Sequence, residues 1–329
     1  GLPLDRLSAG VGRICAPVSL FVPAYLIIVM AGWKGLRSVL PATLACGVAF
    51  AGTQFFVSNF IGPQLTDILS SLAAMGAVLL MLPKRERRPS PHSGRDLMLA
   101  WAPYGLLVVF VLLWGYKPLQ ARLDAFTIPI HWPGLADKPA YRLTWLSASG
   151  TACLFAAILG AIVTGLNVRQ FGRVLTHTAK QLALAELTLA AVLALAYTMN
   201  YSGATATLGL AFAATGRMFP FFGALLGWLG VFLTGSDTSA NALFGSLQVV
   251  TAGKLGMNPV LMAAANSSGG VMGKMISLTS IAVAAAATSM KRSDEALLFR
   301  FTLKHSILLA SVIGLIVMFY TYVMPGWAP

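Results

Sequence analysis

Charged residues are scarce in this chain of 329 residues, where Lys, Arg, Asp and Glu together make up 10%. Soluble domains carry about 25%, so this chain has too few charges to cover a surface exposed to water. Hydrophobic residues, in contrast, make up 57%. The composition therefore excludes a disordered chain and an ordinary water-soluble enzyme, and it leaves an integral membrane protein surrounded by a lipid bilayer.

Acidic residues are the scarcer sign, with 10 Asp and Glu against 23 Lys and Arg and a formal net charge of +13. In a soluble domain this excess would suggest nucleic-acid binding. In a membrane protein basic residues collect in cytoplasmic loops and set the orientation of the spans. We therefore expect no nucleic-acid partner.

Motifs for metal, phosphate or disulfide chemistry are also lacking. The three cysteines, Cys15, Cys46 and Cys153, lie inside apolar runs and fit neither a disulfide framework nor a zinc pattern. The chain has no Cys-x-x-Cys, no His-Glu-x-x-His and no phosphate-binding glycine loop. We expect no metal and no cofactor.

Long charge-free runs are what the sequence does contain. A spanning helix needs about 20 mostly apolar residues, and eleven charge-free windows approach or exceed this length: 14–33, 38–66, 68–83, 97–116, 143–168, 187–216, 218–236, 238–253, 255–273, 275–290 and 305–329. They predict an all-α polytopic membrane protein with about 9–11 apolar helical segments, broken or re-entrant helices included. We expect a single transmembrane domain over residues 1–329.

Basic loops predict the orientation of these segments. The strongest signal is segment 84–96, which opens Lys84-Arg85-Glu86-Arg87-Arg88 and should be cytoplasmic. The loop 117–142 is then external, and the C-terminus is external as well. Because the chain starts with Gly1 and turns apolar almost at once, we expect it to be the later part of a longer chain.

Two polar clusters interrupt the apolar second half. The first, 235–241, places Asp237 among hydrogen-bonding side chains, and a charge at membrane depth is costly unless it faces protein, water or a ligand. The second, 265–277, has three glycines within five residues, which predicts a break in the helix. It also contains the lone cation Lys274. Broken helices of this kind form anion and ion sites in transporters.

Simpler interpretations stay open for both clusters. Small residues let helices pack closely, and Ser, Thr and Asn bond across them; we prefer this interpretation for the glycine pair of 223–227. Asp237 and Lys274 could also pair only with each other. Glu186 either reaches water or carries a proton, and 200–203 interrupts the longest window as a candidate re-entrant turn.

Several long motifs resemble the bacterial L-lactate permease family. They are GWLGVFLTGSDTSANALF (227–244), AANSSGGVMGKMIS (264–277), SIAVA (280–284), SNFIGP (58–63) and LFRFTLKHS (298–306). The resemblance implies a secondary transporter, not an enzyme, that takes up lactate or glycolate with protons across the inner membrane. Inverted repeats are common in such transporters. Leu278-Thr279 stands where the family has Pro-Gln, and the 117–142 loop is shorter than usual.

From the residues themselves we expect the substrate to bind where the two clusters meet. Carboxylate and hydroxyl groups would contact Thr238, Ser239, Asn241, Asn266, Ser267, Ser268, Gly269, Gly270, Lys274 and Ser277. Asp237 is the first candidate for proton coupling and Glu186 the second. The alternatives are a transporter of another small carboxylate, a membrane-embedded enzyme and a non-transporting membrane subunit.

Overall fold

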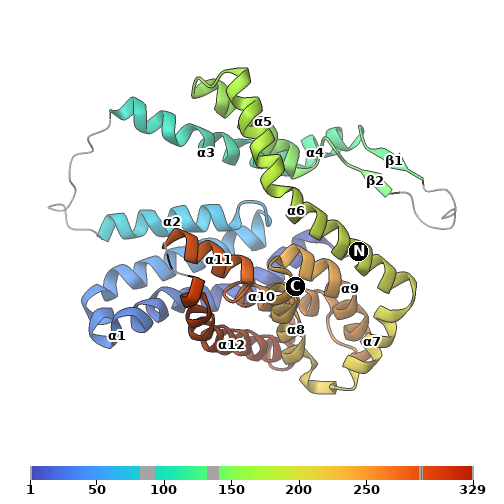
Figure 1. Cartoon of the computed structure of the whole chain (residues 1–329). Helices are drawn as coiled ribbons and strands as arrows, with labels where there is room; N and C mark the ends of the chain where they lie inside the picture. The colour runs from blue at the N-terminus through green and yellow to red at the C-terminus, as the bar shows by residue number, and fades with distance from the viewer. Residues whose placement is uncertain (1, 82–92, 132–140, 289, 291, 328–329) are drawn as a thin grey trace. The chain divides into compact units, whose positions relative to one another are not determined.

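The computed structural model describes residues 2–81, 93–131, 141–288, 290 and 292–327. The basic run 84–88, on which the predicted orientation depends, lies outside the described residues. The chain divides into two compact units, one formed by Gly1–Met81 with Leu184–Pro329 and the other by Leu82–Ala183. Figure 1 shows the helices of both units along the chain.

Helix α1 (Leu4–Phe60) is a hairpin of two helical arms (Figure 1, blue). Gly32 separates the arms with φ 68° and ψ −174°, a backbone conformation that glycine adopts at little cost. The arms correspond to the first two charge-free windows. They pack closely because Gly47 lies against the backbone of Leu20, where a Cβ would come within 2.4 Å of the Leu20 carbonyl oxygen. Helix α2 (Thr66–Met81) packs against this hairpin.

The rest of this unit is a bundle of the later helices. It contains α7 (Ala204–Ala213), the short 3-10 helix η2 (Gly216–Met218), α8 (Phe219–Thr234), α9 (Asp237–Leu255), α10 (Pro259–Lys274), α11 (Leu278–Ala287), α12 (Arg292–Tyr322) and the 3-10 helix η3 (Pro325–Trp327). Helix α10 is central, since it packs against α1, α8, α9 and α12.

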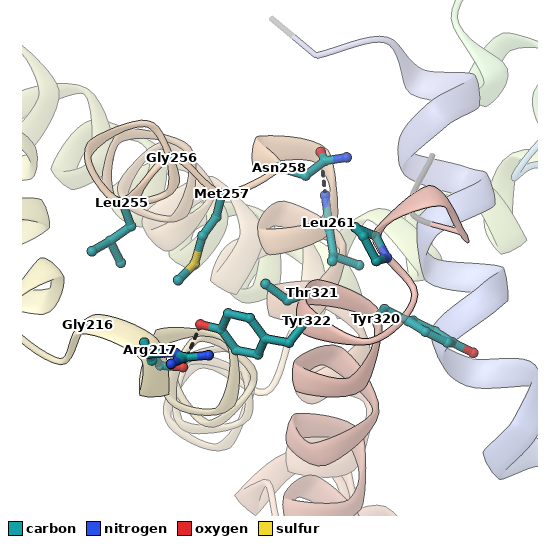
Figure 2. A pocket seen from close by; sticks show the side chains of 11 residues that line it. Gly216, Arg217, Leu255, Gly256, Met257, Asn258, Leu261, Tyr320, Thr321 and Tyr322 are labelled. Atoms are coloured by element: carbon teal, nitrogen blue, oxygen red, sulfur yellow. Dashed lines mark hydrogen bonds between the residues drawn. The ribbon is translucent and has the colours of Figure 1, made fainter.

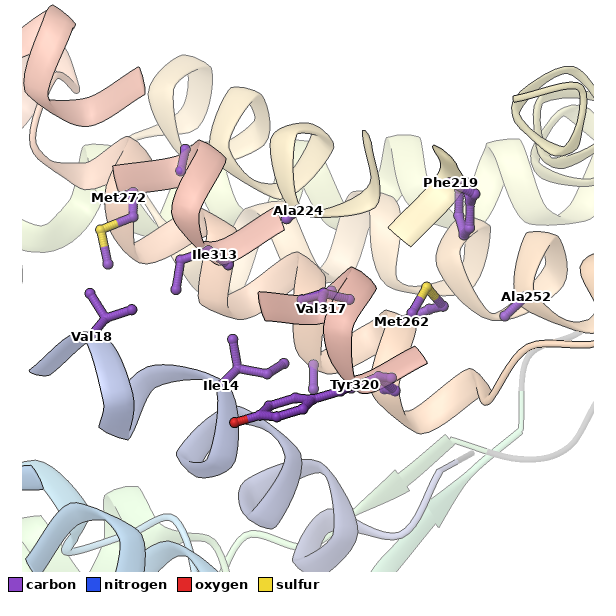
Figure 3. Close-up of a cluster of buried hydrophobic side chains, with 14 residues drawn as sticks. Ile14, Val18, Phe219, Ala224, Ala252, Met262, Met272, Ile313, Val317 and Tyr320 are labelled. Atoms are coloured by element: carbon purple, nitrogen blue, oxygen red, sulfur yellow. The ribbon is translucent and has the colours of Figure 1, made fainter. Parts of the chain in front are cut away.

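A cluster of buried apolar side chains holds this bundle together. Figure 3 shows Ile14 and Val18 of α1 facing Ile313 and Val317 of α12, with Met262 of α10 beside them. Most of the other members are small, which brings the helix backbones close together, as expected where lipid removes the hydrophobic drive for association.

The second unit contains α3 (Gly94–Gly115), α4 (Lys117–Asp124), strands β1 (Ile128–Ile130) and β2 (Tyr141–Leu143), and α5 (Ser149–Val163). Helices α3 and α5 pack through stacked Phe110 and Phe155, whose ring centroids lie 6.3 Å apart. The two strands pair antiparallel, with Ile128 opposite Leu143 and Ile130 opposite Tyr141. Helix α6 (Val168–Tyr201) begins in this unit and ends in the other.

The prediction of an all-α polytopic membrane protein is confirmed. Among the described residues, five helices are long and apolar enough to cross a membrane, or six if the bent pair Val168–Ala183 and Glu186–Tyr201 forms one span. The interruption predicted at 200–203 is present, because α6 ends at Tyr201 and Gly203 takes φ 80° before α7.

Candidate functional site

The first polar cluster forms the predicted break between two helices. Helix α8 ends at Thr234, and Gly235 adopts φ 71°. Ser236 then caps α9, its hydroxyl oxygen accepting a hydrogen bond from the Ser239 backbone N–H at 3.3 Å. Asp237 is thus the first residue of α9, where a carboxylate suits the positive end of the helix dipole.

The second cluster corrects the prediction of a broken helix. Helix α10 runs without interruption through Gly269, Gly270 and Gly273 to Lys274, and the chain leaves the helical path only at 275–277. The glycines serve packing instead. A Cβ at Gly269 would lie 1.9 Å from the Ala224 carbonyl oxygen, so α8 and α10 touch backbone to backbone here.

The same contact is reciprocal. A Cβ at Gly227 of α8 would lie 1.9 Å from the Asn266 carbonyl oxygen of α10. The packing interpretation preferred for 223–227 is therefore confirmed. It also extends to part of the second cluster, where close backbone packing outweighs the low helix propensity of glycine.

Five side chains from α9 and α10 form a continuous hydrogen-bond network. Asp237 Oδ2 accepts from Asn241 Nδ2 at 2.9 Å and from Ser267 Oγ at 2.7 Å. Asn266 Nδ2 donates to Asn241 Oδ1 at 2.8 Å, and Gln248 Nε2 donates to Asn266 Oδ1 at 3.2 Å. In each of these bonds the donor lies further from Asp237 than the acceptor, so the network ends at the carboxylate of Asp237.

Gln248 is a member of this network that the sequence analysis missed. Its side chain is fully buried, and Nε2 also donates to the Gly223 carbonyl oxygen of α8 at 2.8 Å. It therefore ties α8, α9 and α10 together. The available signal was a second amide, after Asn241, in the charge-free window 238–253, since a buried amide must find hydrogen-bond partners.

Three buried polar atoms of this region have no hydrogen-bond partner among the described residues: Asp237 Oδ1, Gln248 Oε1 and Ser268 Oγ. The Ser268 hydroxyl has the thiol of Cys15 on α1 as its neighbour. Orphaned buried polar atoms are uncommon and costly, and they call for an explanation such as a bound species. The orphaned carboxylate oxygen is the most expensive of the three, because a buried charge costs more than a buried hydroxyl.

Lys274 does not pair with Asp237. Its amine donates instead to the carbonyl oxygen of Gly235, at the break between α8 and α9. The side chain is exposed, although the sequence around it is apolar. Lys274 and Asp237 therefore both lie at the break between α8 and α9, without a bond to each other.

A cavity of about 830 Å³ opens beside the network. Asn241 and Ser267, the two donors to Asp237, both line it, together with Ser8, Ser58 and Thr66. Its lining is mixed, with many aliphatic side chains, and Asp67 is the one ionisable group among the described lining residues. A concave, largely apolar site with a few convergent polar groups is the usual form of a small-molecule site.

The remaining predicted site residues are spread more widely. Ser239, whose backbone N–H makes the capping bond to Ser236, is buried, and Thr238 is exposed on α9. Ser277 is buried and caps α11, accepting from the Ser280 backbone N–H at 3.3 Å. Glu186 is exposed on α6, a helix that contributes no side chain to the network.

A second, smaller pocket of about 400 Å³ lies near the other end of α9 (Figure 2). Arg217 stacks on the ring of Tyr322, with its guanidinium carbon 5.3 Å from the ring centroid. The Tyr322 hydroxyl donates to the Arg217 carbonyl oxygen at 2.7 Å. Nearby, Asn258 Oδ1 accepts from the first backbone N–H groups of α10, so this helix end is already capped.

The described residues contain no group of three or more His, Cys, Asp or Glu side chains that could hold a metal ion.

Comparison with known proteins gives a consistent result. A profile described as L-lactate permease matches residues 1–324. The glycolate permease GlcA of Escherichia coli is 41% identical over 99% of this chain and 66% of its own length. The L-lactate permeases of Bacillus subtilis and Escherichia coli are 40% and 38% identical, over 100% of this chain and 67% of their own lengths. The chain thus spans about two thirds of these relatives, and no solved structure matches it.

Proposed function

The chain belongs to the L-lactate permease family, and from that premise we propose that it takes up L-lactate and related 2-hydroxy monocarboxylates by proton symport across the bacterial inner membrane. The observation that carries the proposal is the polar network that ends at Asp237 beside the 830 Å³ cavity. A solute with one carboxylate and one hydroxyl needs a few convergent hydrogen-bonding groups in a largely apolar site.

The substrate contacts follow from the lining of the cavity. Asn241 and Ser267 are the network residues that both reach Asp237 and line the cavity, so they contact the substrate first. Asn266 lies one step behind and orients Asn241. We assign Ser268, with its orphaned hydroxyl, to the same site.

The other predicted contacts belong to this proposal in different roles. Gly269 and Gly270 hold α10 close to its neighbours, which fixes the positions of Asn266 and Ser267. Thr238 and Ser239 lie in the first turn of α9, and Ser277 lies just before α11, so we assign them to the helix ends of the site. Lys274 supplies the positive charge there that a monocarboxylate requires.

Proton coupling is assigned to Asp237. An ionised carboxylate with one buried, unpaired oxygen is unfavourable, and a proton on that oxygen removes the charge. Binding and release of this proton would accompany the movement of the monocarboxylate anion. Glu186, exposed on α6, is the second candidate.

The membrane orientation is part of the same proposal. Basic segment 84–95 faces the cytoplasm, and loop 117–142 and the C-terminus face outward. Labelling of single cysteines placed in each segment of whole cells checks this assignment, which fails if the C-terminus is labelled only after the cells are opened.

Reconstituted vesicles test the transport proposal. If one proton enters with each anion, an inward proton gradient of about two pH units supports up to about 100-fold accumulation of lactate inside the vesicles. Lys274→Ala is expected to abolish lactate uptake, whereas Lys254→Ala, which removes an amine from the last turn of α9, is the matched control and should transport normally. Normal uptake by the Lys274→Ala protein would remove Lys274 from the site.

Asp237→Asn tests the proton assignment separately. The amide keeps the size of the side chain but cannot carry the proton, so exchange of lactate at equal pH should continue while gradient-driven accumulation is lost. Accumulation that still follows the pH gradient would move the role elsewhere, and Glu186→Gln is then the next variant.

Glycolate is the alternative substrate with a specific observation behind it, since one of the relatives is a glycolate permease. A competition panel of two- and three-carbon hydroxy acids against labelled lactate separates the two. Stronger competition by glycolate than by L-lactate would make glycolate the preferred substrate.

A further inference from the structure

A histidine and a tyrosine form an ionisable pair inside the apolar helices, away from the network of Asp237. His305 follows Lys304 directly and begins the charge-free part of the candidate span Asp294–Tyr322 of α12, and Tyr25 lies on the first arm of α1. Ionisable residues inside membrane spans are rare and are functional candidates by default. The transport site described above uses neither of them.

The two side chains are in direct contact. Tyr25 Oη and His305 Nδ1 lie 2.5 Å apart, and the rings meet edge to face with centroids 5.7 Å apart. Phe301 covers the imidazole from the preceding turn of α12, at 4.9 Å between centroids. The ring is therefore fixed in place by a hydrogen bond on one side and an aromatic contact on another.

The other ring nitrogen is the anomaly. Nε2 of His305 is buried and has no hydrogen-bond partner among the described residues. If Nδ1 accepts from Tyr25, then Nε2 carries an N–H with no acceptor; if Nδ1 donates, then Nε2 holds an unused lone pair. Either arrangement leaves one position of the ring uncommitted, in the side chain that gains and loses a proton within the physiological pH range.

The surroundings offer His305 little compensation for a positive charge. Of the helices packed against α12, α8 and α11 carry no ionisable side chain, and α10 carries only Lys274, which is bound to the Gly235 carbonyl. On α1 the facing group is Tyr25. On α12 itself Lys304 lies 5.2 Å over the ring of Phe301. The contacts that the structure describes for the imidazole therefore include no carboxylate.

The next residue connects this pair to the helices of the transport site. Ser306 Oγ accepts from Trp228 Nε1 of α8 at 2.8 Å and donates to the Met272 carbonyl oxygen of α10 at 2.5 Å. Helix α12 therefore contacts α1 through His305 and contacts α8 and α10 through Ser306. Helix α12 thus joins Tyr25 of α1 to α10, the helix that carries Asn266 and Ser267.

We propose that His305 binds a proton during the transport cycle and that Tyr25 positions its ring, so that the contact between α1 and α12 is linked to protonation. The proton adds to the ring nitrogen that holds the lone pair and leaves from the same ring, with no change in covalent bonding elsewhere. When both nitrogens carry protons, Nδ1 can only donate, so the Tyr25 oxygen must accept. The proposal rests on the proposed function, proton-coupled transport of a monocarboxylate.

His305→Gln in vesicles carrying the full chain tests it, with two assays on the same preparation. Exchange of labelled for unlabelled lactate at equal pH needs no net proton movement and should stay within about twofold of the unmodified protein, which also shows that the variant folds. Accumulation driven by a pH gradient should fall by about tenfold or more. His177→Gln on the exposed part of α6 is the matched control and should accumulate normally.

Tyr25→Phe separates the hydroxyl from the ring. It should retain exchange and move the pH at which gradient-driven uptake is half-maximal, because the bond to Nδ1 is lost while the aromatic packing stays. An unmoved pH profile in Tyr25→Phe, or accumulation by His305→Gln equal to that of the unmodified protein, would overturn the proposal. If the unmodified chain exchanges lactate but never follows the pH gradient, the symport proposal itself is wrong, which is a different and distinguishable result.

Discussion

Gly269→Ala is the sharpest test of how the glycine-rich segment is used. The new Cβ would lie 1.9 Å from the Ala224 carbonyl oxygen and 2.7 Å from its carbon, whereas ordinary contacts begin near 3.4 Å. Because the obstacle is the backbone of α8, no side chain can move aside. The two helices must separate by about 1.5 Å, and overpacking of this kind costs about 1–3 kcal/mol or more.

Gly253→Ala is the matched control. Gly253 lies on α9, and no atom lies within 4 Å of the position that a Cβ would take, so the same substitution meets open space. There it should be neutral or stabilise the helix by about 0.5–1 kcal/mol, since alanine has the higher helix propensity. The difference between the two variants is thus about 1–4 kcal/mol.

Thermal unfolding of the purified protein in detergent measures the difference. The Tm of the Gly269→Ala protein should lie about 5 °C or more below that of the Gly253→Ala protein. Lactate uptake should also fall in Gly269→Ala, because displacement of α10 moves Asn266 and Ser267. Equal Tm values for the two proteins would refute the backbone contact between α8 and α10. The interpretation of 265–277 as a broken segment would then be preferred.

Two further substitutions test the network and the break beside it. Gln248→Leu leaves the Gly223 carbonyl and Asn266 Oδ1 without their buried donor. The free energy of unfolding should therefore fall by about 1–3 kcal/mol, and lactate uptake should fall as well. An unchanged Tm would show that this amide does not hold α8 and α9 together. Gly235→Ala forces an alanine into φ 71° and brings its Cβ within 2.7 Å of Thr279 Oγ1. The free energy of unfolding should therefore fall by about 1–2 kcal/mol. A Tm equal to that of the unmodified protein would contradict this account of the break.

The sequence predicted the membrane class and most helix positions because the signals are local. Charge-free windows follow directly from the thickness of the bilayer, and the interruption at 235–241 follows from an aspartate and hydrogen-bonding side chains in apolar sequence. These features depend on neighbouring residues alone.

The prediction failed at Gly269, Gly270 and Gly273, because helix propensity is a weak signal that tertiary contacts override. Which backbone each glycine faces depends on the register of α8 against α10, and this register is not visible in one sequence. The bond of Lys274 to the Gly235 carbonyl depends on the same packing.

Gln248 and the pair of His305 with Tyr25 show the same limit. Each joins residues far apart in the chain: Gln248 reaches Gly223 on α8, and His305 reaches Tyr25 on α1. A buried amide or imidazole must have a hydrogen-bond partner, but only the fold identifies it.

Protection of a cysteine in the cavity by substrate tests the central claim most directly. In a chain whose three native cysteines are replaced by serine, Ser267→Cys places one thiol in the cavity lining, and Ser38→Cys places one on the exposed surface of α1 as the control. L-lactate or glycolate should slow maleimide labelling of Ser267→Cys and leave Ser38→Cys unaffected. Labelling of Ser267→Cys at the same rate with and without saturating lactate and glycolate would contradict a substrate site at the Asp237 network.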